Sequence, residues 1–342
     1  MRTSGDQLER THHPAELLSD PPALDRRFCV APMLDCTDRH ARYLMRLISR
    51  HAVLYTEMVT TGALLHGDRQ RFLSFDASEH PLALQLGGSE PDEMAECAQI
   101  AQDWGYDEVN INVGCPSDRV QSGAFGACLM RTPERVAECI SAMHARTRLP
   151  ITVKCRIGVD DQDPRCALWA LVEACAQAGC STFIVHARKA WLKGLSPKEN
   201  RDVPPLDYDL VYDLKRQFSE LTIILNGGIS DLEACQRHLT QVDGVMLGRE
   251  VYANPYWLSQ VDAVFYEDEK PCPSRDAVLE AYVEYMAREM AQGTRLNHMT
   301  RHAVGSFHGE PRSRIWRRCI SEQAHKPDSD HTLLLKARAA MA

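Results

Sequence analysis

The chain has 342 residues, of which 44% are hydrophobic and 25% charged, and its formal net charge is −8 at pH 7. These fractions are typical of globular proteins and exclude a membrane span, because no run approaches about eighteen apolar residues. The thirteen cysteines form no CxxC pair and no finger-type Cys/His spacing, so we expect no metal site and no disulfide framework, but reduced thiols in the cytoplasm.

The first segment, residues 1–26, is polar and contains Pro14, Pro21 and Pro22. It lacks the apolar stretch of a secretory signal, so a disordered leader is predicted.

Eight short apolar runs alternate with helical patterns between residues 27 and 262. The predicted strands are Phe28–Pro32, Val53–Glu57, Leu82–Leu86, Glu108–Asn112, Ile151–Lys154, Thr182–His186, Thr222–Asn226 and Gly244–Leu247. The predicted helices include Pro91–Trp104, Pro133–Ala145 with Thr132 as N-cap, and Cys166–Ala178 ending at Gly179. Eight strands with a crossover after each predict an α/β fold, a (β/α)8 TIM barrel.

The pattern changes after residue 262, and residues 263–342 are predicted to form an all-helical C-terminal domain. Ser274 caps an amphipathic helix whose apolar stripe is Val278, Tyr282, Met286 and Met290. Six arginines and a single acid, Glu310, lie between Arg295 and Arg318. Such a local basic stripe on an acidic chain indicates a nucleic-acid partner, although a solvated helix face would give the same composition.

Polar residues end six of the predicted strands, at the rim where TIM barrels carry their chemistry. They are Gln85, Asn110, Asn112, Lys154, Arg156, His186, Arg188, Asn226 and Arg249. A mouth lined in this way predicts a polar, planar ligand.

The loops after the last two strands, Asn226-Gly227-Gly228 and Gly248-Arg249, predict a phosphate site. Glycines let backbone N–H groups approach an anion, and a helix N-terminus and an arginine add positive charge; alternatively, both are tight turns that need positive φ. Lys154 favours flavin mononucleotide (FMN) over a sugar phosphate because a cation stabilises the charge of a reduced flavin. Lys154 as a Schiff-base lysine is the alternative. Gln85, Asn112 and His186 would then bind ring edges or substrate.

Long stretches of the chain resemble the tRNA-dihydrouridine synthases, in particular the bacterial A-type branch that acts on uridines 20 and 20a. The stretches are APMLDCTDRHAR, TEMVTTGAL, PLALQLGG, NINVGCPSDRVQSGAFGACLM, VKCRIGVDD, KAWLKGLSPKENRDVPPLDY, LNGGI, GVMLGREVYANPY and RIWRR.

The resemblance implies a role for each matching residue. FMN would contact Pro32, Met33, Gln85, Lys154 and His186, and its phosphate would contact Asn226, Gly227, Gly228, Gly248 and Arg249. The residues expected to contact tRNA are Asn112, Lys198, Arg201, Arg314 and Arg317. Cys115 matches the family's proton donor, NADPH would reduce the flavin, and a monomer is expected.

The expected reaction reduces the C5=C6 bond of uridine in tRNA, with hydride from flavin N5 reaching C6 and a proton from Cys115 reaching C5. Two other functions fit parts of the sequence. A flavoenzyme acting on a small pyrimidine such as dihydroorotate would share the barrel but would not need the arginine-rich tail. A non-catalytic RNA-binding protein would carry no flavin.

Overall fold

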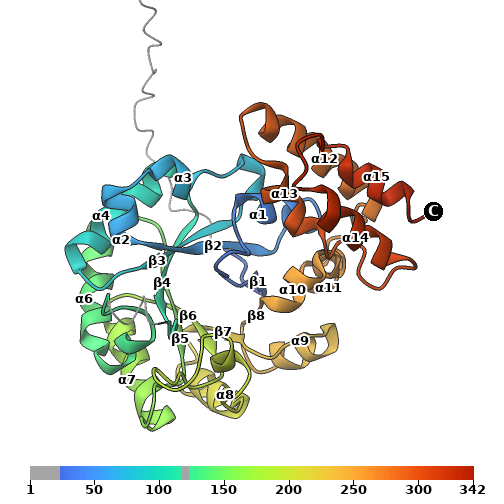
Figure 1. Ribbon diagram of the computed structural model, residues 1–342. Helices are drawn as coiled ribbons and strands as arrows, with labels where there is room; N and C mark the ends of the chain where they lie inside the picture. The colour runs from blue at the N-terminus through green and yellow to red at the C-terminus, as the bar shows by residue number, and fades with distance from the viewer. Residues whose placement is uncertain (1–23, 118–122) are drawn as a thin grey trace, which may run out of the picture.

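The computed structural model describes residues 24–117 and 123–342, so residues 1–23 of the predicted leader lie outside the described residues. Eight parallel strands close into a barrel in sequence order (Figure 1). They are β1 Phe28–Val30, β2 Val53–Thr60, β3 Leu82–Gly87, β4 Glu108–Val113, β5 Ile151–Arg156, β6 Thr182–His186, β7 Thr222–Asn226 and β8 Gly244–Leu247. All eight lie where the sequence predicts a strand, and the predicted TIM barrel is confirmed.

Helices cover the outside of the barrel and build the tail. Those of the barrel are α1 Arg39–Arg46, α2 Thr61–His66, α3 Arg69–Leu73, α4 Pro91–Trp104, α6 Pro133–His144, α7 Pro164–Gln177, α8 Tyr208–Gln217, α9 Leu232–Leu239, α10 Arg249–Ala253 and α11 Val261–Tyr266. Short 3-10 turns are η1 Ala77–Glu79, η2 Gly126–Arg131, η3 Glu199–Arg201 and η4 Pro255–Gln260. Within the described ranges, no helix is both long and apolar enough to span a bilayer.

Helix α6 begins as predicted, with Thr132 at the N-cap and Pro133 at the first helical position, although the Thr132 side chain accepts no hydrogen bond from the helix. One predicted helix start needs correction. Helix α7 begins two residues before the predicted Cys166, because the Asp163 carboxylate accepts the backbone N–H of Cys166 at 2.8 Å and so caps the helix.

The tail consists of α12 Arg275–Ala291, α13 Leu296–Ala303, α14 Ser313–Gln323 and α15 Leu333–Ala339. Ser274 caps α12 as predicted, by accepting the N–H of Ala277 at 3.2 Å. The apolar stripe of α12 is buried at Val278, Tyr282 and Met286. These helices belong to the same continuous apolar cluster as the helical layer of the barrel, so barrel and tail pack as one body (Figure 1).

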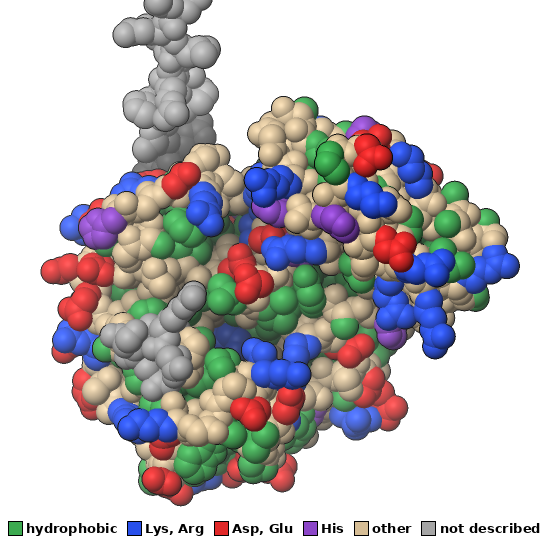
Figure 2. Space-filling view, viewed as in Figure 1, with side chains coloured by type: hydrophobic (Ala, Val, Ile, Leu, Met, Phe, Trp, Pro, Cys, Tyr) green, Lys and Arg blue, Asp and Glu red, His purple; other side chains and the backbone are tan. Residues whose placement is uncertain are grey.

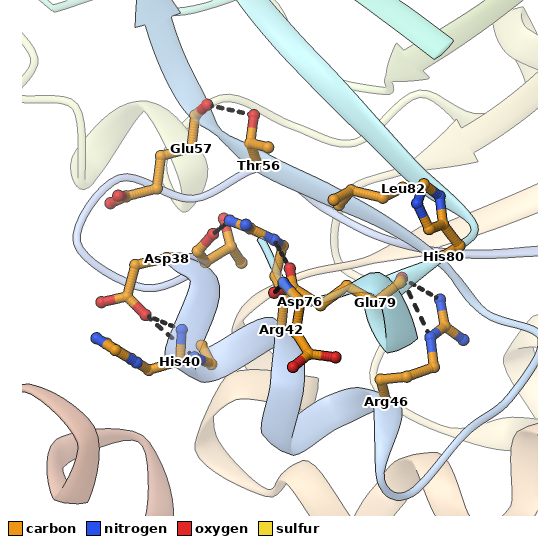
Figure 3. A network of polar contacts seen from close by, with 12 residues as sticks. Asp38, His40, Arg42, Arg46, Thr56, Glu57, Asp76, Glu79, His80 and Leu82 are labelled. Atoms are coloured by element: carbon orange, nitrogen blue, oxygen red, sulfur yellow. Dashed lines mark hydrogen bonds and ion pairs between the residues drawn. The ribbon is translucent and has the colours of Figure 1, made fainter. Parts of the chain in front are cut away.

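Helix α1 joins the barrel to the tail. On the barrel side, the buried Arg42 guanidinium pairs with Glu79 at 2.7 Å, and Arg46 donates to carbonyl oxygens that include that of Glu79 (Figure 3). On the tail side, the His40 Nδ1 atom lies 2.7 Å from the Tyr285 hydroxyl of α12. The orientation of the tail is therefore fixed by buried polar contacts as well as by apolar packing.

Asp38, the N-cap of α1, is the second link to the tail. Its carboxylate accepts the backbone N–H groups of His40 and Ala41, pairs with Arg301, and lies 2.9 Å from the His302 Nε2 atom. Burial opposes ionisation, but His302 and Arg301 lower the pKa of Asp38 well below its usual range. Arg301 and His302 therefore hold the tail against the barrel, although the sequence counts them within the basic stripe.

Candidate active site at the barrel mouth

Alternate residues of the strands point into the barrel, so one face of each strand supplies the site. On β4 these are Glu108, Asn110 and Asn112, and all three are buried. The strand register pairs Gln85 with Asn110, and Asn112 with Lys154. The polar residues that end these strands in the sequence are therefore neighbours in space.

The loop after β4 carries Cys115, and side chains of β4 and β5 hold its backbone. The Asn112 Oδ1 atom accepts the backbone N–H groups of Gly114 at 3.1 Å and Cys115 at 2.9 Å. Buried Arg156 donates its Nε–H to the Gly114 carbonyl at 3.0 Å. The Cys115 thiol is half-buried, in contrast to Cys29, Cys139, Cys155 and Cys175, which are buried as the sequence predicts. The loop thus presents this thiol to the mouth.

Positive charge gathers on the β5–β6 side of the mouth. The Lys154 Nζ atom donates to the Asn226 Oδ1 atom at 3.0 Å, which brings these two predicted cofactor ligands together. Burial, followed by the Arg156 guanidinium, lowers the pKa of Lys154 to about 8. Burial, with the charges of Arg156 and Lys154, lowers the pKa of His186 well below its ordinary value, so His186 is neutral at pH 7. Side chains packed this way favour an anion.

The two glycines after β7 form a close cradle. Gly227 and Gly228 have φ values of 110° and 70°, so the alternative reading as turns with positive φ is correct for this loop. A Cβ atom on Gly227 would lie 2.4 Å from a ring carbon of His186, and one on Gly228 would lie 2.5 Å from Leu206. The Tyr208 hydroxyl donates to the Gly227 carbonyl at 2.7 Å. The positive φ values do not exclude a phosphate. Glycine, which this backbone requires, also lets backbone N–H groups approach an anion closely.

The loop after β8 lies beside the loop after β1. Gly248 does not have a positive φ, and a Cβ atom there would lie 3.0 Å from the Met33 sulfur. A side chain at position 248 would therefore press on Met33. Pro32 and Met33 are both half-buried at this point, and Met33 packs on the apolar cluster inside the barrel. The predicted contacts at Pro32, Met33 and Gly248 are thus adjacent.

The predicted helix N-termini lie at the two loops, but neither contributes a strong dipole. Helix α9 begins four residues after Gly228, and the Asp231 carboxylate already caps it by accepting the Ala234 N–H. Helix α10 begins at Arg249, directly after Gly248 and without a capping side chain among the described residues, but it has only five residues and so a small dipole. Most of the positive charge at this site therefore comes from side chains.

Two arginines supply that charge. Arg249 forms an exposed ion pair with Asp202 at 2.7 Å. Arg188 has a buried Nε–H without a hydrogen-bond partner among the residues that the structure describes. An unpaired buried donor costs about 1–3 kcal/mol, so a ligand oxygen that accepts from Arg188 would remove this cost.

Carboxylates line the opposite side of the mouth. Glu57, near the end of β2, accepts the backbone N–H of Asp35 in the β1–α1 loop, and Figure 3 shows its side chain extending toward the loop that carries Asp38. Burial raises the pKa of Glu57. The mouth therefore has its cations on the β5–β8 side and the Glu57 carboxylate on the β1–β2 side.

The predicted tRNA contacts fall into three places. Asn112 is buried below Cys115, whereas Lys198 and Arg201 are exposed on the β6–α8 loop around η3. The side chain of Asn200 holds this loop by bonding the backbone of Trp191 in both directions, at 2.7 and 2.9 Å.

Arg314 and Arg317 are exposed on α14, three residues apart on a helix as predicted, and within the described ranges neither makes an ion pair or side-chain hydrogen bond. Figure 2 shows Lys and Arg side chains in and around a hollow on one face of the barrel, and more of them on the part of the tail that carries α14.

The amino-acid sequence from residue 29 to residue 341 matches the family model described as dihydrouridine synthase (Dus). The chain belongs to this family. A dihydrouridine synthase is an enzyme, and this prediction from sequence is confirmed.

Curated relatives are similar over almost their full length. A tRNA-dihydrouridine(20/20a) synthase of Shewanella oneidensis is 58% identical over 309 residues, which are 90% of this chain and 92% of the relative. Synthases of the same name from Vibrio cholerae and Pseudomonas syringae are both 55% identical, over 92% and 94% of this chain and over 96% and 95% of their own length.

Several residues of the dihydrouridine synthase mouth were not selected from the sequence as site residues. Arg156 and Arg188 are visible in the sequence as cations at strand ends. Only the fold shows that Arg156 is buried and that Arg188 has a buried Nε–H. Glu108 and Thr152 lie deeper, and the signal that points to Glu108 is its i, i+2 spacing with Asn110 and Asn112 on β4.

Proposed function

We propose that this dihydrouridine synthase reduces the C5=C6 bond of uridines 20 and 20a in tRNA, with FMN as its flavin and NADPH as reductant. The position of Cys115 carries the proposal: a half-buried thiol at the end of β4, held by Asn112 and Arg156 on the cationic side of the mouth. The names of the similar proteins support the choice of positions 20 and 20a. A tRNA substrate would also place the enzyme in the cytoplasm.

The described residues fit the anionic end of FMN. Gly227 and Gly228 leave no room for a Cβ atom, and Arg188 offers a buried N–H that lacks an acceptor. Arg249 would turn from Asp202 to the phosphate, exchanging an exposed ion pair, which contributes little, for a charge-assisted hydrogen bond. Lys154, Gln85 and His186 would face the ring. When bound and reduced, FMN supplies the hydride that C6 of the uracil receives.

Cys115 supplies the other half of the reduction. Addition of hydride at C6 moves the C5=C6 electron pair toward the C4 carbonyl, and the Cys115 S–H then gives its proton to C5. The atoms balance, since one hydride and one proton saturate one double bond. Arg156 also holds the loop of this proton donor, because its Nε–H donates to the Gly114 carbonyl at 3.0 Å.

The direct test is to map dihydrouridine in tRNA from cells that lack this protein. We expect dihydrouridine to disappear from positions 20 and 20a, and to return when the purified enzyme, FMN and NADPH are added to that tRNA. Normal dihydrouridine at both positions in the deficient cells would contradict the proposal.

The tail is proposed to grip the tRNA backbone through Arg314 and Arg317. Replacing both by alanine should weaken tRNA binding and reduce the slope of log affinity against log salt by about 2, one unit for each lost phosphate contact. Binding would be measured by fluorescence anisotropy at several salt concentrations.

The matched control removes Arg146 and Arg148, two exposed arginines just before β5, at the opposite end of the barrel from the mouth. This control changes the net charge equally and should leave the slope unaltered. Equal slopes for the α14 variant and the unmodified protein would exclude the grip.

A further inference from the structure

A chain of side-chain hydrogen bonds crosses the inside of the barrel from the start of β4 to the Cys115 loop. Its links in order are Thr152 Oγ1 to Glu108 Oε1 at 2.6 Å, Asn110 Nδ2 to Thr152 Oγ1 at 2.9 Å, Gln85 Nε2 to Asn110 Oδ1 at 2.7 Å, Asn112 Nδ2 to Gln85 Oε1 at 2.9 Å, and Cys115 N to Asn112 Oδ1 at 2.9 Å. The five side chains that form these links are each at most 9% exposed, so water has little access to the hydrogen bonds. They are Glu108, Thr152, Asn110, Gln85 and Asn112. We call this series the interior relay.

Both ends of the interior relay impose the same direction of donation. An ionised carboxylate can only accept, so the single hydroxyl proton of Thr152 is directed to Glu108 and its oxygen accepts from Asn110. At the other end the backbone N–H of Cys115 can only donate, so Asn112 must present its oxygen there. Reversing any one amide in between would set donor against donor. The orientation of the Gln85 amide is therefore fixed from both sides.

The starting point of the interior relay is itself rigid. The Glu108 carboxylate accepts two hydrogen bonds from Arg26, at 2.8 and 2.6 Å, and one from the Tyr55 hydroxyl at 2.8 Å. Glu108 and Tyr55 are fully buried, and the charge of Glu108 is balanced by Arg26. Arg26 lies within the predicted leader in sequence, yet its side chain is part of the barrel.

We propose that Glu108, Thr152 and Asn110 are positioning residues, which act through Gln85 and Asn112 to hold the Cys115 loop and to fix the Gln85 amide. They touch neither the thiol nor, in the proposed function, the uridine. The consequence for catalysis rests on the proposed function of Cys115, whereas the mechanical coupling does not. Removing the Thr152 hydroxyl leaves the Asn110 amide held only by its hydrogen bond from Gln85. The Asn110 side chain should then be less firmly placed, and this looser hold should pass through Gln85 and Asn112 to the loop.

The test compares Thr152→Val with Thr152→Ser, which restores a hydroxyl, in the full-length chain. The readout is the rate of alkylation of Cys115 by iodoacetamide divided by that of the exposed Cys166 in the same molecules, measured by mass spectrometry of peptides. We expect the ratio to rise about fivefold in Thr152→Val, the factor that corresponds to one lost hydrogen bond of about 1 kcal/mol. Thr152→Ser should keep the original ratio.

A matched control separates this effect from general loss of stability. Thr147 is also a buried threonine, and its hydroxyl donates to Gln102 at 2.9 Å outside the barrel mouth. Thr147→Val should lower the melting temperature without changing the alkylation ratio. If Thr152→Val does not fold, Asn110→Asp breaks the same link from the other side, because it removes the N–H that Thr152 accepts.

An unchanged Cys115-to-Cys166 ratio in a folded Thr152→Val or Asn110→Asp variant would overturn the interior relay. So would an equal rise in the Thr147→Val control. These outcomes are distinct from failure of the proposed function, which would appear as normal uridine reduction without the Cys115 thiol and does not enter the alkylation ratio.

Discussion

Uridine reduction by a Cys115→Ser variant is expected to be slower by about 100- to 10,000-fold, the usual contribution of a positioned general acid. The hydroxyl of serine is a far weaker acid than a thiol, so C5 would have to take its proton from water. Reduction of bound flavin by NADPH needs no proton donor opposite the ring and should keep its rate. Single-turnover oxidation of the reduced flavin by tRNA, followed by absorbance, measures the affected step alone.

The matched control for this prediction is Cys36→Ser. Cys36 is another half-buried thiol at the carboxyl end of a strand, in the segment between β1 and α1, but the proposed chemistry gives it no part. The Cys36→Ser enzyme should therefore reduce uridine normally. Wild-type turnover by Cys115→Ser would remove this thiol from the mechanism, and equal loss in both variants would point to a general effect of thiol replacement at the mouth.

Replacement of Lys154 by methionine is expected to weaken FMN binding by about 10- to 100-fold, because hydrogen bonds from charged groups contribute about 1.5–3 kcal/mol. In the unmodified protein the affinity should also fall as pH rises through about 8, where the Lys154 ammonium loses its proton. Lys154→Arg keeps a positive charge throughout this range and should abolish the inflection. Quenching of flavin fluorescence between pH 6.5 and 9.5 measures both effects.

Deprotonation of Lys154 should change the stability of the ligand-free protein in the direction opposite to its effect on flavin affinity. The pKa of Lys154 is lowered from its ordinary 10.5 to about 8, so between these values the unfolded chain binds more protons than the folded one. The free energy of unfolding contributed by Lys154 should therefore rise across this window, while flavin affinity falls. An affinity inflection near pH 8 that persists in Lys154→Arg would assign it to another group. Lys336→Met, on the exposed face of α15, is the neutral control.

The fold was largely predictable because its signals are local. Each buried strand, such as Thr182–His186, is a short apolar run bounded by turn residues, and such a run predicts a strand without knowledge of its tertiary contacts. The same holds for Ser274 and for the polar residues at strand ends, since parallel strands bring their carboxyl ends to one rim. Lys154 and Asn226 both lie at this rim as the rule predicts, and the structure adds that their side chains are in contact.

Contacts between distant segments were not predictable. The sequence offers Arg249 to a phosphate, but only the folded β6–α8 loop brings Asp202 to it. Arg301 and His302 look like parts of a basic stripe until helix α13 meets Asp38 of the β1–α1 loop. The start of α7 was predicted two residues late for a smaller reason, because the Asp163 cap depends on one side-chain rotamer.

The sequence by itself determined the barrel and its rim of polar groups, since these depend on residue type and short-range periodicity. Its long motifs carried the resemblance to the family and, through it, the choice of the thiol at residue 115. The tertiary structure alone decided which cations have their pKa lowered by burial, which arginine N–H has no acceptor among the described residues, and how Glu108 is connected to Cys115. Those properties depend on barrel closure and register, which place side chains from five segments within hydrogen-bonding distance and exclude water from between them.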